Sequence, residues 1–204
     1  MKPAIHQIIP SIRSGDAVGN TTLRLRDTLR ELGYRSDIFR ERCSPDLETE
    51  TLPAEKYLER SDPDNIVFFQ YSIGSELGRY VYHLPDQIIM VYHNISPPED
   101  FIGIHDHVVG ELYHGRKQVA QFANRCLLGV SESEFNRQEM VEMGFPRTAL
   151  LPLAIDFDSL DGEPDPYIID AYNDEKHNLL FVGRIVPNKG IEDLIKLYAH
   201  YKKF

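Results

Sequence analysis

Short apolar runs alternate with amphipathic stretches along almost the whole chain. The apolar runs have the length of buried strands, whereas the stretches between them repeat their apolar positions at helical spacing. This alternation predicts an α/β fold, a Rossmann-like doubly wound parallel sheet covered by helices on both faces. The predicted strands cover residues 5–9, 36–39, 66–70, 88–92, 126–130, 149–151 and 178–182.

The predicted helices lie between these strands, and several have recognisable ends. Asn20 or the threonine after it can cap the first helix, and Gly33 can end it because glycine readily adopts a positive φ. Ser131 or Ser133 can cap the helix that follows the fifth strand, and Gly144 can end that helix. Helices are expected over residues 20–32, within 74–84, within 107–124, over 132–143 and after residue 190.

The region before the last predicted strand differs from the rest of the chain. Residues 152–176 are rich in Asp, Pro and Gly and show no periodicity, which is typical of an interdomain linker. We therefore predict a first domain over residues 1–155, a linker over 156–177, and the first strand and helix of a second domain over 178–204. Because one strand and one helix cannot bury their own apolar faces, we expect this second domain to be truncated at Phe204.

Composition excludes some function classes. The formal net charge of −10 over 204 residues argues against a nucleic-acid partner and against binding to an anionic membrane surface. Two cysteines do not make a disulfide framework, and neither a secretion signal nor an apolar run of spanning length is evident. We therefore expect a cytoplasmic protein, and peripheral membrane contact of the intact protein remains open.

Arginines are concentrated in the first 42 residues, against the overall acidic balance. Two interpretations are open for them. They can form an ordinary solvated helix face, or they can meet an anionic acceptor or a lipid headgroup. The arginines concerned are Arg13, Arg24, Arg26, Arg30, Arg35, Arg40 and Arg42.

Polar and glycine-rich segments follow the predicted strands, where a doubly wound sheet binds its ligands. Residues 14–20 (SGDAVGN) follow the first strand, and their two glycines and the helix start that comes next suit an anion or sugar hydroxyls. A flexible turn with an Asn cap is the alternative. His93 and Asn94 follow the fourth strand and are held by two prolines, which suits either a sugar contact or a structural histidine.

A turn with two cations precedes the last helix. Residues 179–195 (LLFVGRIVPNKGIEDLI) place Arg184 and Lys189 between an apolar run and a helix N-terminus. Both cations and the helix N-terminus then converge on one place, which suits a diphosphate. An exposed pair of surface cations is the alternative.

Four segments, taken in order, resemble retaining glycosyltransferases of the GT-B fold, family four. They are residues 14–20, 91–99 (VYHNISPPE), 130–133 (VSES) and the turn from Gly183 to Gly190. The resemblance covers the whole chain. It implies transfer of a hexose from a nucleoside diphosphate sugar to an acceptor hydroxyl with retention of configuration, with no metal and no further cofactor. The implied acceptor is a sugar, a glycan or a lipid-linked molecule.

The resemblance also implies roles for individual residues. In such enzymes the histidine lies near the reacting carbon of the donor sugar, and the arginine and lysine hold the diphosphate and offset its developing charge. The implied catalytic residues are His93, Arg184 and Lys189. The implied donor-binding residues are Gly15, Asp16, Gly183, Arg184 and Lys189. The implied acceptor-binding residues are Asn20 and Asn94. Tyr71, Ser72 and Glu132 are further candidates for the acceptor because they follow predicted strands, and capping of the next helix is the alternative for the segment after the third strand.

Other signals favour different functions less well. Residues 62–64 and 156–158 read Asp-x-Asp, a metal-holding pattern, but both fall in turns. The glycine fingerprint of dehydrogenases and the phosphate loop of nucleoside triphosphatases are missing. Two alternatives stay open, namely a non-catalytic sugar- or partner-binding module and another GT-B-fold enzyme such as a nucleotide-sugar epimerase.

Overall fold

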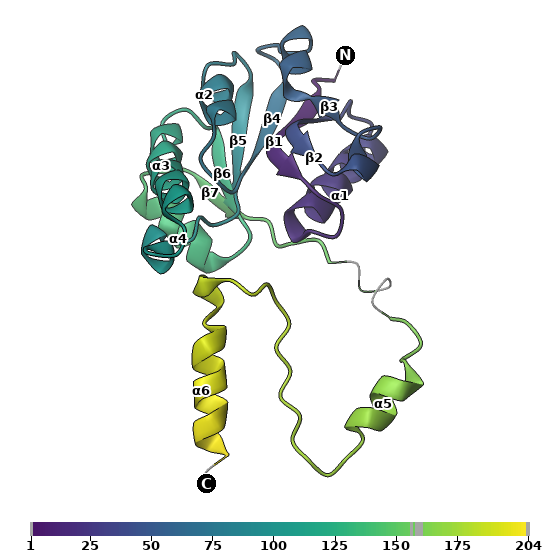
Figure 1. Cartoon of the computed structure of the whole chain (residues 1–204). Coiled ribbons are helices and arrows are strands. Elements are labelled where there is room, and N and C mark those ends of the chain that lie inside the picture. The colour runs from purple at the N-terminus through teal and green to yellow at the C-terminus, as the bar shows by residue number, and fades with distance from the viewer. Residues whose placement is uncertain (1, 156, 158–160, 203–204) are drawn as a thin grey trace. The chain divides into compact units, whose positions relative to one another are not determined.

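The computed structural model describes residues 2–155, 157 and 161–202 of the chain (Figure 1). The chain divides into two compact units, Met1–Ala154 and Ile155–Phe204. All strands found among the described residues belong to the first unit.

The first unit is built on one sheet of seven parallel strands in the order β3-β2-β1-β4-β5-β6-β7. This arrangement confirms the predicted doubly wound α/β fold. Six of the predicted strands are present, and the structure adds a short edge strand, β3, that pairs with β2. The strands are β1 Ile5–Ile12, β2 Ile38–Cys43, β3 Leu52–Pro53, β4 Ile66–Tyr71, β5 Gln87–Tyr92, β6 Leu128–Ser131 and β7 Thr148–Leu150.

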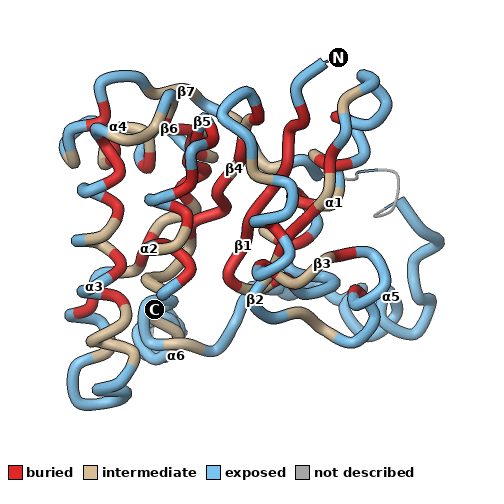
Figure 2. Tube along the Cα trace, turned by 90° about the horizontal axis from the view of Figure 1, so that it is seen from above, coloured by how far each residue is buried: buried red, intermediate tan, exposed pale blue. Residues whose placement is uncertain are grey.

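Helices cover both faces of this sheet, as Figure 2 shows from above. The right-handed crossovers of parallel strands put α1 on one face and α2, α3 and α4 on the other, because the chain reverses direction across the sheet after β3. The α-helices of this unit are α1 Ala17–Glu31, α2 Glu76–Tyr82, α3 Asp106–Phe122 and α4 Glu134–Glu142. Short 3₁₀ turns are η1 Pro45–Leu47, η2 Ala54–Glu59 and η3 Pro98–Phe101.

The core has two parts, one on each face of the sheet. The larger part joins alternate residues of the central strands, such as Phe69 and Met90, to α2 and α3 residues such as Val81 and Phe122. The smaller part joins β1 and β2 to the apolar side of α1. Successive side chains of a strand point to opposite faces, so a central strand such as β1 contributes to both.

The ends of the helices agree only in part with the prediction. Helix α1 starts at Ala17 rather than at Asn20, and its N-cap is Asp16. The early start is possible because residue 19 is a glycine. A Cβ atom at this position would lie 2.2 Å from the carbonyl oxygen of Arg13. Gly33, with a φ of +80°, ends this helix as predicted. Ser133, and not Ser131, caps α4 by accepting a hydrogen bond from the Asn136 amide at 3.2 Å.

The second unit differs from the prediction in two elements. Residues 178–182 are predicted to be a strand, but they form none, and the side chains of Leu180 and Val182 are exposed. An apolar run of strand length needs a neighbouring strand to bond to, and the described residues of this unit supply none. The unit contains α5 Pro166–Tyr172, which lies inside the predicted linker, η4 Pro187–Lys189 and α6 Ile191–Tyr201.

None of the helices in the described part of the chain combines the length and hydropathy that a bilayer crossing requires.

Candidate functional site

Segments far apart in the sequence meet at the carboxyl ends of the central strands. Strands β1, β4, β5 and β6 are neighbours, so the residues that follow each of them lie along one edge of the sheet. Strands β2 and β3 extend the sheet on one side of β1, and strands β4 to β7 extend it on the other side, so the strand order reverses between the neighbours β1 and β4. Open α/β sheets bind ligands in the crevice outside such a switch point. The strand-end edge is therefore the candidate site.

A chain of buried polar side chains runs beneath this edge. Gln7 of β1 donates from Nε2 to the Thr22 carbonyl oxygen of α1 at 2.8 Å. Gln70 of β4 donates from Nε2 to Gln7 Oε1 at 2.8 Å, and Gln70 Oε1 lies 2.6 Å from His93 Nε2. His93 Nδ1 lies 2.5 Å from Glu132 Oε1. Residues on or directly after four adjacent strands thus form one continuous polar connection.

The His93 ring is enclosed by this connection. Its side chain is 1 % exposed, whereas that of Glu132 is 17 % exposed. Both ring nitrogens face oxygen atoms of the protein, so the imidazole offers no unoccupied nitrogen to a ligand. Glu132 is therefore the member of the pair that can be reached from outside.

The loop after β5 is held in place by a second set of contacts. Tyr92 donates from its hydroxyl to Glu139 Oε2 at 2.8 Å and accepts from the Ile95 amide at 3.1 Å. Arg116 of α3 donates to the Ile95 carbonyl oxygen at 2.6 Å and also pairs with Glu139. Burial raises the pKa of Tyr92, which keeps the hydroxyl protonated as a donor. These bonds tie the loop to α3 and α4.

Asn94 occupies an unusual backbone conformation in this loop. Its φ is +59°, and it is the one non-glycine residue with a positive φ in the described part of the chain. Its Nδ2 donates to Oδ1 of the buried Asn136 of α4 at 2.9 Å. Left-handed residues other than glycine are retained where the surroundings impose them, and they occur preferentially at ligand sites.

The loop after β1 contributes exposed groups. Gly15 has a φ of +75° with open space around it, and Asp16, although it is the N-cap, makes no capping hydrogen bond with its side chain. Asn20 lies exposed within the first turns of α1. Ser14 donates its amide to Ser44 Oγ at 3.4 Å. This contact ties the loop to the end of β2.

Tyr71 and Ser72 take different positions at the end of β4. Tyr71 is fully buried, and its hydroxyl is turned to α3, where it lies 2.7 Å from Gln118 Oε1. Its side chain is therefore part of the core and not of the strand-end edge. Ser72 follows the strand and is partly exposed.

Gly183, Arg184 and Lys189 lie in the second unit, and all three are exposed. Lys189 ends the turn η4, and Gly190 after it adopts a left-handed conformation with a φ of +59° directly before α6. The sequence order of cation, turn and helix start is thus present locally. Within this unit the first turn of α6 carries Glu192 and Asp193.

A groove of about 890 Å³ lies elsewhere, between α2 and α3. It contains none of the residues predicted for the site. Among the described residues no group of three or more His, Cys, Asp or Glu side chains could hold a metal ion. Asp62 accepts from the Asp64 amide at 2.9 Å, as in a turn, and most of the other Asp-x-Asp segment lies outside the described residues.

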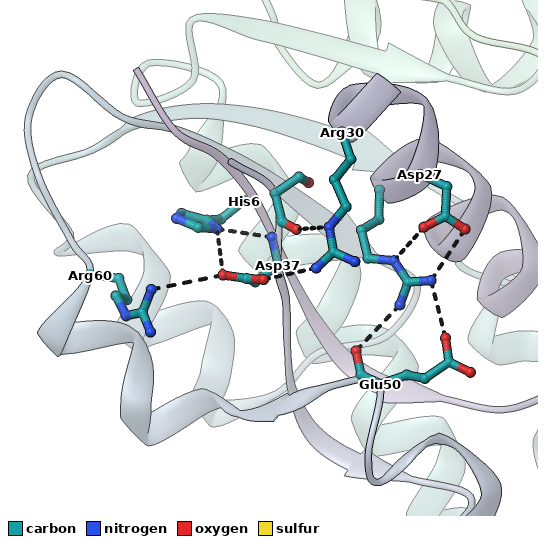
Figure 3. A network of polar contacts seen from close by, with 8 residues as sticks. His6, Asp27, Arg30, Asp37, Glu50 and Arg60 are labelled. Atoms are coloured by element: carbon teal, nitrogen blue, oxygen red, sulfur yellow. Dashed lines mark hydrogen bonds and ion pairs between the residues drawn. The ribbon is translucent and has the colours of Figure 1, made fainter. Parts of the chain in front are cut away.

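Two of the clustered arginines have structural roles. Arg30 donates to the Ser36 carbonyl oxygen at 2.7 Å and pairs with Asp37, which also faces His6 and Arg60 (Figure 3). Arg26 is buried and binds Asp27 and Glu50, which are both labelled in the same view. For these two arginines the structure favours a role in joining α1 to its surroundings over a role in binding an acceptor.

Sequence reasoning missed several residues that shape the candidate site. Gln7 sits inside an apolar run and does not follow a predicted strand, so it was not among the predicted site residues. Asn136 and Glu139 lie on α4 and reach the loop after β5 only because β5 and β6 are adjacent. The one available signal was polarity at buried strand positions, as at Gln7 and Gln70.

No protein-family model matches the chain, and no curated protein matches it significantly.

Proposed function

We propose that this chain is part of a retaining glycosyltransferase that transfers a hexose from a nucleoside diphosphate sugar to an acceptor hydroxyl. The observation that carries the proposal is the convergence at one edge of the sheet. Residues 14–20, 93–94 and 131–132, which carry three of the four resembling segments, lie at the carboxyl ends of β1, β5 and β6. This is the edge at which a doubly wound sheet binds ligands.

In this proposal the two units have different tasks. The strand-end edge, with Asp16, Asn94 and Glu132, binds the acceptor and one side of the donor. Arg184 and Lys189 hold the diphosphate and stabilise the charge that develops on it as the sugar leaves. Both ring nitrogens of His93 are already hydrogen-bonded, which supports a role in positioning rather than as a free base.

We also propose a cytoplasmic location, which two unpaired cysteines support.

The test is a transfer assay on the protein produced from its complete reading frame. The protein is incubated with a panel of nucleoside diphosphate hexoses and hydroxyl acceptors, and the release of nucleoside diphosphate and the anomeric configuration of the product are measured. Transfer with retention is expected from at least one donor. Hydrolysis alone, inversion or no turnover across the panel would contradict the proposal.

A matched pair of substitutions tests the role of the cation. Arg184→Ala should lower turnover by roughly 10²–10³-fold, because a preorganised contact to the developing charge is lost, and should leave acceptor affinity nearly unchanged. Arg79→Ala is the control, since Arg79 is also an exposed arginine and pairs with Glu76 on its own helix. Equal turnover of the two variants would remove Arg184 from the mechanism.

A non-catalytic sugar- or partner-binding module is the second candidate. The observation that favours it is the closed environment of His93, whose side chain presents no reactive nitrogen. Such a module would bind hydroxyl-bearing ligands at the strand-end edge without releasing nucleoside diphosphate in the same assay.

A further inference from the structure

The polar connection under the strand-end edge has a defined direction. It starts at the Thr22 carbonyl oxygen, which can only accept a hydrogen bond. The group of Gln7 that faces it must therefore be the NH₂ donor, at 2.8 Å. Gln7 Oε1 then points to Gln70 as an acceptor.

The same logic passes through Gln70 to the imidazole. Because Gln7 presents an oxygen, Gln70 must present its NH₂ group to it, which leaves Gln70 Oε1 facing His93 Nε2 at 2.6 Å. An oxygen acceptor at that position requires a proton on Nε2. Gln7 and Gln70 are 0 % and 1 % exposed, so bulk water does not compete for either hydrogen bond.

We propose that Gln7 and Gln70 are positioning residues that fix the proton of His93 on Nε2, so that Nδ1 and Glu132 share a second proton. The inference rests on the proposed function in that it specifies how one part of that site is held. The remaining hydrogen bond, Nδ1 to Glu132 Oε1 at 2.5 Å, needs one proton from either side. His93 and Glu132 together then carry no net charge.

This proton order has a chemical consequence at the edge. The imidazole cannot accept a proton from an acceptor hydroxyl, because neither ring nitrogen has an unoccupied lone pair. Glu132 is fixed in orientation through its Oε1 and is the least buried member of the connection. Gln70, although it is itself buried, thus determines how the carboxyl group of Glu132 is presented.

The direct test is the state of the ring nitrogens in the folded protein. The full chain is labelled with ¹⁵N-histidine, and long-range ¹H–¹⁵N spectra are recorded near neutral pH. The signals of His93 are assigned by their loss in His93→Asn. A protonated Nε2 is expected for His93 in the unmodified protein. An Nε2 without a proton would overturn the inference, whatever the variants do.

Substitutions then separate positioning from simple packing. Gln70→Met keeps the volume but removes the acceptor, and Gln7→Met removes the group that orients Gln70, so both should turn the His93 signals into a mixture of tautomers. Gln70→Glu keeps an oxygen toward Nε2, and burial favours its protonated form, whose O–H can donate to Gln7 Oε1 as the amide did, so this variant should keep the original pattern. Gln121→Met, at an exposed glutamine of α3, is the control. His93 spectra that are unchanged in Gln70→Met would overturn the inference.

A kinetic measurement adds an independent result. In the transfer assay Gln70→Met should lower kcat by on the order of tenfold, as is typical when a group that orients a site residue is removed, with little change in the KM for the donor, and Gln70→Glu should restore much of it. The ring-nitrogen spectra decide the inference without any assay of transfer. Failure of the proposed activity and failure of the proton order are therefore separate outcomes.

Discussion

Two buried histidines of this protein are held in different proton states by their neighbours. His93 faces oxygen atoms on both ring nitrogens. His6, by contrast, accepts a hydrogen bond at Nδ1 from the Asp37 amide at 3.1 Å, which requires that nitrogen to be without a proton. Burial lowers the pKa of His6, and the nearby Asp37 carboxylate opposes this only in part. His6 is thus neutral in the folded protein.

The lowered pKa of His6 predicts a pH dependence of stability. The unfolded chain binds a proton at His6 near its ordinary pKa of 6.5, whereas the folded protein binds it only at lower pH. The free energy of unfolding should therefore be fully retained above pH 6.5 and fall as the pH drops below it, by at most about 1.4 kcal/mol per pH unit from this group. Urea unfolding of the wild type and of His6→Asn, at a pH about one unit above and one unit below that pKa, measures the effect.

Asparagine is the informative replacement because its side-chain oxygen can still accept from the Asp37 amide. His6→Asn should be less stable at neutral pH but should show a smaller loss on acidification. His83→Asn, at an exposed histidine, should keep the wild-type pH dependence. Equal acid sensitivity of wild type and His6→Asn would show that other groups account for the whole effect.

At the scale of elements, the position of α3 depends on how closely it approaches the loop after β4. A Cβ at Gly115 would lie 2.7 Å from the backbone nitrogen of Gly74 and 3.0 Å from Cδ1 of Ile95. Gly110 lies in the same helix, and a Cβ added there would have no neighbouring atom within 4 Å. The two glycines therefore have different structural roles within one helix.

Alanine at these two sites should have opposite effects. Gly110→Ala should raise the free energy of unfolding by roughly 0.5–1 kcal/mol, because it removes backbone freedom from the unfolded chain without a clash. Gly115→Ala should lower it by about 1–3 kcal/mol, because backbone atoms of residue 74 must move. Denaturant titrations of both variants test this, and a stabilised Gly115→Ala would show that α3 can shift freely.

Elements with a clear helical period or a continuous apolar run were predictable, and those that depend on a distant partner were not. Strands such as β4 and β5 are continuous apolar runs and were found near their observed bounds. The run at residues 178–182 is similarly apolar but has no neighbouring strand among the described residues, so composition alone misled. Strand β3 has only two residues, one of them Pro53, and gives no periodic signal.

The candidate site shows the same division. Glu132, His93 and Asn94 could be found because they follow strands, where ligand-binding residues of this fold lie. The partners that hold them could not, because Thr22 contributes a backbone carbonyl and Gln7 lies inside a strand. Sequence order carries no information on which side chains of adjacent strands meet unless the strand order is known.

At the scale of the whole molecule, the two units differ in how they are stabilised. The first unit contains both parts of the hydrophobic core. Neither α5 nor α6 of the second unit has a buried residue, and Leu197 and Tyr201 of α6 are among its exposed apolar residues. The first unit should therefore be able to fold around its sheet by itself.

A shortened chain tests this expectation. A variant ending at Ala154 should unfold cooperatively at nearly the same temperature as the chain of 204 residues. A variant ending at Gly144 is the contrast, because it loses the buried Phe145 and the whole of β7. Circular dichroism melting curves measure both. A large drop in the melting temperature of the longer variant would show that the second unit stabilises the first.

The two edges of the sheet carry different kinds of polar groups. At the amino ends of the strands, His6, Asp37 and the buried Asp86, which accepts from the Tyr57 hydroxyl at 2.5 Å, bind the sheet to its surroundings. At the carboxyl ends lie the groups of the candidate site. The polar residues that hold the amino ends are thus separate from those of the candidate site, which would relax the usual trade-off between stability and activity. Loops at the carboxyl edge can diversify toward new ligands during evolution while the opposite edge preserves folding.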